Sequence, residues 1–433
     1  DHRDLHYPLR RQRQMCIRDR DGSASLTFVP TAGKSNRPNG VRSPVRSVVK
    51  HSGTMFSGNQ FPICAVSAVP RQRGNGRRND APNVESPLVI TPPGSKFQTC
   101  VRRADLDLVE ALLHISIIIP NWNGAHHLPD CLDSLRQQVF RDFDVIVVDN
   151  GSQDDSLDVL ARYPEAQVIA LGENRGFTGA CNAGFRAARG DVQVLLNNDT
   201  EADPRWLAEI AVAFESYSEV GLLASKMLLF DHRDTFHTAG DILTEDGLPH
   251  NRGVWQKDEG QFDHPAYVFS ACGGSAAYRK TMLDQVGLLD DDFFFSFEDV
   301  DLAWRAQLVG WRCLYVPTAI VYHKLKASGG GVTASFYDGR NRIFTLVKNY
   351  PANLWRAYWR AVLGAQWRVI WEALRLWRGA EARATLRGVA AGLVGIPKMW
   401  RKRRKVQAMC RVDMAYLEQL MKAPHEIPVA PTD

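Results

Sequence analysis

The chain of 433 residues is 45% hydrophobic and carries a formal net charge of +5, a length that usually corresponds to one domain with additional segments. The charge is segregated: residues 1–105 contain 18 Lys and Arg against 7 Asp and Glu, residues 106–350 contain 20 against 35, and residues 351–433 contain 15 against 6. An acidic middle between basic flanks argues against a uniformly basic nucleic-acid surface, so we expect no nucleic-acid partner.

The cysteines and the apolar runs bear on the cellular compartment. The eight cysteines are scattered without a C-x-x-C pair, so the sequence signals neither a zinc site nor a disulfide framework and favours a reducing cytosol. It shows neither a charged-then-apolar signal peptide nor a run of 18 apolar residues. We therefore expect a cytoplasmic protein, not a lumenal or polytopic one.

Residues 1–105 are rich in Arg, Ser, Pro, Gly and Asn and lack sustained apolar periodicity. Such a composition is typical of disorder. The stretch MCIRDR at 15–20 looks like a translated sequencing adapter, so we expect this segment to be disordered or in part non-native. The alternative is a basic arm that binds nucleic acid.

From Ile115 onward, short apolar runs alternate with helical patterns. The runs are Ile115–Ile119, Val145–Val148, Val168–Ala170 and Val192–Leu196. Helical patterns cover residues 128–135, a stretch ending at about residue 162, and residues 178–189. This alternation predicts an α/β domain over residues 113–350 with a buried, mostly parallel sheet. Ligands bind beyond the carboxyl ends of such strands, so the residues directly after each run are informative.

Residues after the first two runs are candidates for binding a nucleoside. Trp122 offers a flat face to a base, or it packs on the edge of the domain. Asp149 can accept hydrogen bonds from a pyrimidine or a ribose, or it caps the next helix. Gly172–Gly184 then brings Gly and Asn residues to a helix start, where backbone N–H groups can approach phosphate. That segment lacks the G-x-G-x-x-G fingerprint of dinucleotide-binding folds.

Acidic residues follow two later elements. Asp199 comes directly after the fourth run, in the sequence Asn197-Asn198-Asp199, where a divalent cation could bind with a diphosphate completing its shell; the alternative is an Asx-rich turn. Glu298 and Asp299 follow four aromatic residues at a predicted helix start, where the helix dipole alone would favour acids. The functional alternative is a carboxylate beside an acceptor hydroxyl. His323 ends another apolar run and would join a metal site only if Asp199 lies nearby.

Residues 351–433 are predicted to form a basic helical tail. Tryptophans alternate there with arginines, namely Trp355, Trp359, Trp367, Trp371 and Trp377 with Arg356, Arg360, Arg368, Arg375 and Arg378. The stretch KMWRKRRK at 398–405 adds six positive charges. This composition resembles an interfacial helix, so we expect contact with an anionic membrane surface. The alternative is a helical subdomain with a solvated basic face.

Five motifs in this order resemble those of glycosyltransferase family 2. They are Pro120–Asn123 (PNWN), Asp149–Ser152 (DNGS), Asn174–Gly176 (NRG), Asn197–Asp199 (NND) and Phe297–Leu302 (FEDVDL). The resemblance covers residues 115–350 and points to the bacterial rhamnosyltransferase-like members. It implies a GT-A fold, inversion at the anomeric carbon, a divalent metal (Mn²⁺ or Mg²⁺) and a nucleotide-diphosphate sugar donor such as dTDP-rhamnose. It also implies a saccharide or lipid-linked acceptor in cell-surface polysaccharide synthesis, and hence a peripheral location on the inner face of the cell membrane.

The resemblance also implies roles for individual residues. The donor-binding residues would be Pro120, Trp122, Asn123, Asp149, Asn174, Arg175 and Asn198. Asp199 would ligate the metal with His323, although Asn197 stands where the family's D-x-D motif often has its first Asp. Asp299 would be the general base, with Glu298 as the neighbouring candidate. Gly273, Gly274 and Trp304 would line the acceptor site.

Two alternatives from other functional classes remain. A nucleotidylyltransferase would need a Gly-rich basic loop near residues 120–127, which contain one Gly and no Lys or Arg. A non-catalytic sugar-binding protein would be favoured by loss of Asp199 or Asp299, and both are present. The Q-x-x-R-W motif of processive synthases is missing, so we expect transfer of one or a few sugars.

Overall fold

The computed structural model describes residues 113–324 and 331–422. The expectations for residues 1–105 therefore lie outside the described residues. The first part of the described chain contains β1 (Ile115–Asn121), α3 (Leu128–Arg136), β2 (Phe143–Asp149), α4 (Ser156–Leu160), β3 (Ala166–Ala170), α5 (Gly176–Ala187) and β4 (Val192–Leu196). All four predicted strands are present. Helix α5 begins two residues earlier than predicted, at Gly176, where the Asn174 side chain accepts the Gly176 N–H and so satisfies a backbone donor at the helix start.

The middle of the chain adds further strands and three helices. These are β5 (Thr200–Ala202), α6 (Trp206–Ser216), β6 (Val220–Leu229), β7 (Phe236–Thr238), β8 (Asp241–Leu243), β9 (Pro249–Asn251), β10 (Ala266–Val268), β11 (Ser275–Arg279), α7 (Lys280–Val286), α8 (Glu298–Val309) and β12 (Arg312–His323). Helix α8 begins at Glu298, where the sequence predicts it.

The central sheet has the strand order β10-β12-β6-β11-β4-β1-β2-β3, with β5 paired to β12 and β7 paired to β6. Within the described residues, six of the eight strands on this path run in one direction, and only β10 and β11 run in the other. Strands β8 and β9 form a separate two-stranded sheet. The predicted α/β fold with a mostly parallel central sheet is confirmed.

Both faces of the sheet are covered by helices, which explains why the strands are continuous apolar runs. On one face, Ile118, Ile146 and Leu195 pack with residues of α5, α7 and α8. On the other, Ile117, Val147 and Val194 pack with residues of α3, α4 and α6. Alternate residues of one strand therefore enter opposite cores.

The strand register brings the predicted site residues together. Asn121 at the end of β1 is paired with Asp149 at the end of β2. On the other side of the sheet, β12 pairs antiparallel with β5 so that His323 is opposite Thr200. Because Asp199 directly precedes Thr200, this pairing brings the end of β12 to the end of β4.

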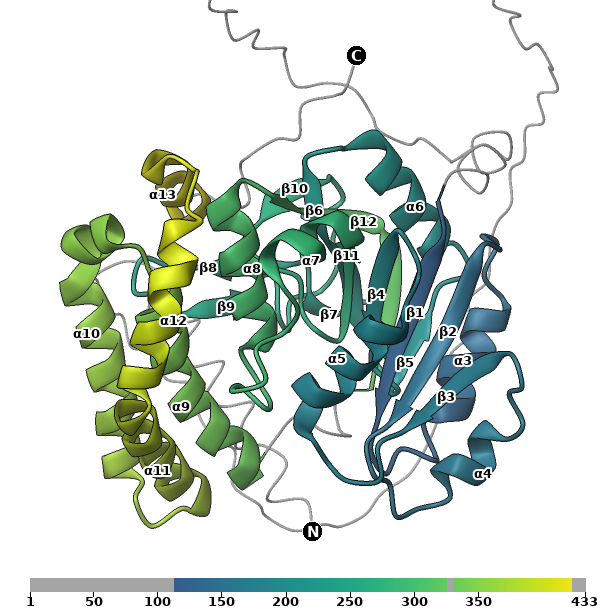
Figure 1. The fold of residues 1–433 in the computed structure, drawn as a ribbon, viewed down its shortest axis with the longest axis horizontal. Helices are drawn as coiled ribbons and strands as arrows, with labels where there is room; N and C mark the ends of the chain where they lie inside the picture. Colours follow the sequence, from purple (N-terminus) through teal and green to yellow (C-terminus); the bar gives the residue numbers. More distant parts are fainter. Residues whose placement is uncertain (1–112, 325–330, 423–433) are drawn as a thin grey trace, which may run out of the picture. The chain divides into compact units, whose positions relative to one another are not determined.

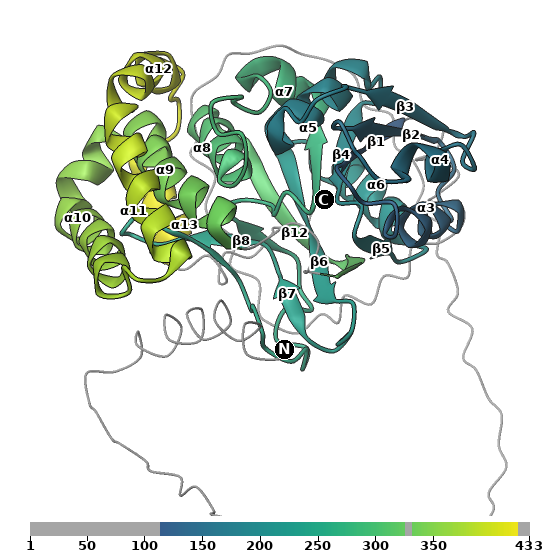
Figure 2. The same cartoon turned by 90° about the horizontal axis from the view of Figure 1, so that it is seen from below.

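The C-terminal part is helical, as predicted. It contains α9 (Gly331–Asn349), α10 (Ala352–Arg375), α11 (Ala380–Val394), α12 (Ile396–Ala408) and α13 (Met414–Lys422). Helix α9 packs against α8, α11 and α12, and both views show α9 to α12 gathered away from β1–β3 (Figures 1 and 2). No helix within residues 113–324 and 331–422 combines the length and apolarity needed to cross a bilayer.

A buried ionic network joins these helices to the α/β part of the chain. Lys348 of α9 contacts the carboxylates of Asp290 and Asp301. Asp301 also accepts hydrogen bonds from Arg305 and Asn349. Asp301 is fully buried and its oxygens are engaged, so it is a structural residue that fixes α8 against α9.

Candidate active site

Side chains at the ends of β1, β2 and β4 form one hydrogen-bonded group. The Asn121 amide donates to Asp149 Oδ1 at 3.2 Å and accepts from Asn198 Nδ2 at 2.7 Å. The Ser152 backbone N–H donates to Asp149 Oδ2 at 3.1 Å. Helix α4 begins after Asp155, so Asp149 does not cap that helix. Its carboxylate is instead held in place at the edge of the sheet.

The PNWN motif forms a tight turn beside this group. Asn123 has a φ of 52°, and its side-chain oxygen accepts the Gln153 N–H at 2.7 Å. The turn leaves the Trp122 side chain 56% exposed, while Pro120 is half-buried in β1. The indole is therefore not part of the hydrophobic core and is accessible to a planar ligand.

The start of α5 is organised by two asparagines. The Asn150 side chain accepts the Arg175 N–H at 2.8 Å and donates to Asn174 Oδ1 at 3.1 Å. Asn174 Oδ1 also accepts the Gly176 N–H at 2.8 Å. The Arg175 side chain is exposed and contacts Glu173 at 3.2 Å. This arrangement holds the loop between β3 and α5 close to Asp149 and leaves the Arg175 guanidinium near the surface.

Asp199 and His323 form a buried pair, with His323 Nε2 at 3.1 Å from Asp199 Oδ1. Burial raises the pKa of Asp199, but the hydrogen bond and charge of His323 outweigh it, so the pKa is lower than usual. His323 Nδ1 in turn lies 3.1 Å from His237 Nδ1. Burial and the charge of His323 lower the pKa of His237 to about 3, so His237 stays neutral. His237 was not predicted from the sequence, because it lies on the short strand β7 and belongs to no motif.

Asp299 and Glu298 lie at the first turn of α8 in different settings. Asp299 accepts the Gly273 N–H at 2.9 Å and the Val300 N–H at 2.7 Å. Burial nevertheless raises its pKa. Glu298 is more deeply buried, and its Oε2 has no hydrogen-bond partner among the described residues. Burial and the charge of Asp299 raise the pKa of Glu298 well above its usual range. Glu298 therefore holds its proton more strongly, and Asp299 is the better candidate for a carboxylate.

Two consecutive glycines connect the acidic pair with the Asp199–His323 pair. A Cβ on Gly273 would lie 3.5 Å from Asp299 Oδ2 and 3.6 Å from Glu298 Oε1. A Cβ on Gly274 would lie 3.6 Å from His323 Cε1. Because consecutive Cα atoms are only about 3.8 Å apart, the two pairs belong to one site at the end of the sheet.

Trp304 differs from its expected position in the acceptor site. It is 1% exposed, and its ring makes edge contacts with Phe269 and Tyr350 at centroid distances of 4.9 Å and 5.7 Å. Trp304 points into the core because α8 packs this side against the sheet and α9. The structure therefore assigns Trp304 to the core, and its side chain is not available to an acceptor.

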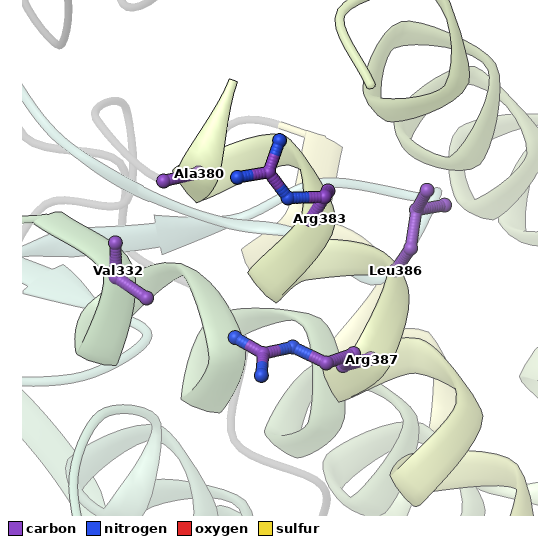
Figure 3. Close-up of a pocket in the computed structure, with 5 residues that line it drawn as sticks. All are labelled: Val332, Ala380, Arg383, Leu386 and Arg387. Atoms are coloured by element: carbon purple, nitrogen blue, oxygen red, sulfur yellow. The ribbon is translucent and has the colours of Figure 1, made fainter. Parts of the chain in front are cut away.

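A separate cavity of about 490 Å³ lies between α9 and α11. Val332 of α9 lines it together with Ala380, Arg383, Leu386 and Arg387 of α11 (Figure 3). None of the predicted site residues lines this cavity. Its walls combine apolar side chains with two arginines, and one of these, Arg383, donates to the backbone carbonyls of Trp377 and Arg378.

The side chains of Asp199 and His323 supply only part of the ligand set that a divalent cation needs. Across residues 113–324 and 331–422, no three His, Cys, Asp or Glu side chains are grouped to hold a metal ion. One carboxylate and one imidazole are nevertheless a suitable protein contribution where substrate phosphates and water supply the remaining ligands. A metal at this position would therefore depend on a bound diphosphate.

Comparisons with known proteins agree with this architecture. Residues 116–300 match the family model "Glycosyl transferase family 2". An uncharacterized glycosyltransferase of Nostoc sp. is 33% identical over 185 residues, which are 41% of this chain and 54% of that protein. The chain thus spans about half the length of this relative. The N-acetylglucosaminyl-diphospho-decaprenol L-rhamnosyltransferase of Mycobacterium tuberculosis is 23% identical over 270 residues, which are 56% of this chain and 87% of that protein.

Among solved structures, the crystal structure of GalNAc-T7 with UDP, GalNAc and Mn²⁺ superimposes with a TM-score of 0.53 at 15% sequence identity. The match covers 72% of this chain and 57% of that one. This likeness concerns the fold, which is the GT-A fold that the motifs imply. The match to the family model identifies residues 116–300 as a domain of glycosyl transferase family 2.

Proposed function

We propose that this chain is an inverting glycosyltransferase that moves a sugar from a nucleotide-diphosphate donor to a hydroxyl of a saccharide or lipid-linked acceptor. The observation that carries the proposal is the position of Gly273 and Gly274. The Gly273 N–H donates to Asp299, and a Cβ on Gly273 would lie 3.6 Å from Glu298 Oε1. A Cβ on Gly274 would lie 3.6 Å from His323 Cε1 of the Asp199–His323 pair. A proton acceptor and a candidate leaving-group site are thus adjacent.

The donor would lie along the ends of β1, β2 and β4. The exposed Trp122 indole offers a face on which the base can stack. The Asp149 carboxylate is ordered by Asn121 and Ser152, so a ribose or pyrimidine can hydrogen-bond to it without first ordering the group. At the start of α5, Asn174 would hold the loop in place, and the exposed Arg175 guanidinium would contact the diphosphate.

A divalent cation, Mn²⁺ or Mg²⁺, would be held by Asp199 and His323 beside the diphosphate. As metal ligands, the Asp199 carboxylate and the His323 imidazole would both have to be unprotonated. When bound, the cation would neutralise charge on the departing diphosphate. His237 would orient the His323 ring through the 3.1 Å contact between their Nδ1 atoms.

Asp299 would take the proton from the acceptor hydroxyl. In a single displacement with inversion, the hydroxyl attacks from the side opposite the leaving nucleotide, so its proton must be accepted on that side. The Gly273 N–H orients the Asp299 carboxylate at 2.9 Å, and a positioned base of this kind can serve as general base. Glu298, with its raised pKa, would remain protonated and donate a hydrogen bond.

The C-terminal helices would bring the enzyme to an anionic membrane surface and so to a lipid-linked acceptor. Four tryptophans of α10 recur on one side of the helix, and each is at least 40% exposed, namely Trp355, Trp359, Trp367 and Trp371. Soluble surfaces seldom expose such a row of large aromatic side chains. The two arginines of the α9–α11 cavity add positive charge nearby. The decaprenol-linked substrate named for the mycobacterial relative supports an acceptor of this type.

A donor screen tests the proposal directly. The chain would be mixed with dTDP-rhamnose, UDP-hexoses or GDP-mannose in the presence of Mn²⁺. Binding would be followed by calorimetry and turnover by released nucleotide, with a saccharide and a lipid-linked saccharide as acceptors. We expect one donor class to bind and to be consumed only when acceptor is present. Failure of every donor to bind would contradict the proposal.

A further inference from the structure

The loop that precedes α8, residues 293–297, has an uncommon backbone. Phe294, Ser296 and Phe297 have φ angles of 62°, 68° and 69°, a region that is unfavourable for residues other than glycine. Phe297 directly precedes Glu298 and Asp299, the first two residues of α8. The conformation of this loop therefore determines where the two carboxyls are placed, and contacts from elsewhere must maintain it.

Asn341 of α9 supplies most of these contacts. Its side chain is fully buried, and its Nδ2 donates to the backbone carbonyl oxygens of Phe293 at 2.9 Å, Phe295 at 2.8 Å and Ser296 at 2.7 Å. One side-chain amide thus holds three of the five residues of the loop.

Arg340 fixes the orientation of that amide. Its Nε donates to Asn341 Oδ1 at 2.9 Å, which directs the amide nitrogen toward the loop. Its Nη2 donates to the carbonyl oxygens of Asp292 at 2.7 Å and Phe293 at 2.8 Å. The Arg340 guanidinium therefore binds the backbone at the start of the loop and also orients the Asn341 side chain.

The same loop is in contact with the predicted donor segment. The Phe294 carbonyl accepts the Thr178 N–H of α5 at 3.2 Å, and a Cβ on Gly176 would lie only 2.5 Å from the Phe294 oxygen. On its other side, the Phe294 ring stacks on Tyr337 of α9 at 5.1 Å. A movement of the loop would therefore displace the acidic pair relative to the start of α5.

The rest of α8 is attached to α9 independently. Asp301 accepts hydrogen bonds from Lys348 and Asn349, about two turns further along α9 from Asn341. These contacts do not involve Asn341, so they persist when its side chain is shortened. Loss of Asn341 should release the loop and the first turn of α8 without detaching the helix.

We propose that Asn341 and Arg340 are positioning residues, which hold the loop 293–297 so that Asp299 faces the acceptor hydroxyl at the correct distance from the donor. This inference rests on the proposed role of Asp299. It adds two residues outside all five sequence motifs, from a helix that follows the segment matching the family model. It also gives α9 a role in positioning the proposed general base.

The test compares Asn341→Ala and Arg340→Lys with the unmodified chain and with Gln307→Ala. Gln307 is the matched control, because it is also a buried amide that donates to two backbone carbonyls, those of Val268 and Phe269. Donor affinity is measured by calorimetry, turnover by released nucleotide, and folding by thermal unfolding. Arg340→Lys retains the charge but loses the planar guanidinium, and it carries the test if Asn341→Ala does not fold.

We expect kcat to fall about 10- to 100-fold in Asn341→Ala, because small displacements of a catalytic group have effects of this size. Donor affinity should change less than about threefold. The kcat of Arg340→Lys should lie between that of Asn341→Ala and that of the unmodified chain. Gln307→Ala should lose stability but retain kcat. An unchanged kcat in Asn341→Ala, or an equal loss in Gln307→Ala, would overturn the inference.

The same series separates this inference from the proposed function. Asp299→Asn is measured alongside. If the unmodified chain turns over no donor, or if Asp299→Asn is fully active, the assignment of Asp299 fails and the positioning role fails with it. If both behave as proposed and Asn341→Ala keeps its kcat, only the positioning role is wrong.

Discussion

His323 Nε2 lies 3.1 Å from Asp199 Oδ1, although the two residues are 124 positions apart in the chain. The contact arises because β12 ends at His323 and pairs with β5, which begins one residue after Asp199. Among the described residues, neither Asp199 nor His323 forms a salt bridge with a third side chain. We propose that this pair would hold a divalent cation whose other ligands come from the donor.

Replacing Asp199 with Asn should remove the metal-dependent part of donor binding. The amide keeps the shape of the side chain but not the charge that a divalent cation requires. We expect calorimetry to show that Mn²⁺ no longer strengthens nucleotide binding and that turnover is lost. Asp158→Asn, on the exposed face of α4, is the control. Persistent turnover in excess chelator would contradict a metal role for this pair.

Asp299→Asn should lower kcat by about 10²–10⁴-fold, the usual contribution of a general base, with donor affinity nearly unchanged. A parallel loss of donor binding would instead make Asp299 structural. If Asp299→Asn retained wild-type turnover, Glu298→Gln would become the decisive variant. Both substitutions preserve shape, so a difference between them reports on proton transfer.

The pH dependence of turnover should reflect the setting of Asp299. Burial raises the pKa of this carboxyl, so its basic form appears at higher pH than for an exposed Asp, and kcat should rise with pH through that raised pKa. The ionisable groups that interact with it electrostatically are Glu298, Asp241, Cys272, Cys181 and Tyr278. None of these is cationic, so they do not favour its ionised form. A pH profile whose acidic limb is unchanged in Asp299→Asn would contradict this assignment.

Asp290 should stabilise the attachment of the C-terminal helices. Burial raises its pKa, but the charges and hydrogen bonds of Lys348 and Lys402 outweigh this and hold the pKa below its usual range. A lowered folded-state pKa contributes stability above the unfolded pKa, and this contribution is lost as pH falls through the folded pKa. Asp290→Asn should therefore reduce the free energy of unfolding near neutral pH by about 3 kcal/mol.

Urea unfolding at neutral and acidic pH checks that expectation. The difference between Asp290→Asn and the unmodified chain should shrink in acid, where Asp290 becomes protonated. Asp284→Asn is the matched control, because Asp284 forms an exposed ion pair with Lys280, and exposed pairs contribute at most about 1 kcal/mol. Equal effects of the two substitutions would show that the buried network does not stabilise the fold.

The exposed tryptophans and the cavity arginines should determine binding to lipid vesicles. Trp367→Ala with Trp371→Ala should weaken co-sedimentation with anionic vesicles, because indole side chains favour the headgroup level. Arg383→Gln with Arg387→Gln should weaken it further in a salt-dependent manner, by roughly 1 kcal/mol for each cation. Vesicles without anionic lipid are the control. Sedimentation that is insensitive to both double variants would contradict this surface.

The strands could be predicted from the sequence because each is a continuous apolar run that fills two cores at once. Ile117 and Ile118, for example, enter opposite faces of the sheet, so most residues within the run are apolar. The polar exceptions Ser116 and Gln193 are buried and hydrogen-bonded. The polar residues at the strand ends are therefore visible in the sequence, and with them the candidates Trp122, Asp149 and Asp199. The start of α8 at Glu298 was predictable from a different local signal, because acidic residues favour a helix N-terminus.

Only the tertiary structure decided which of these residues meet, and which are buried. The sequence suggested Trp304 for an acceptor site, but the packing of α8 places it in the core. His237 and Asn341 carry no local signal, because their positions depend on β7 pairing with β6 and on α9 packing against the loop before α8. Local apolar spacing thus determined the strands and helices, whereas long-range pairing, which no local pattern encodes, brought the side chains of the site together.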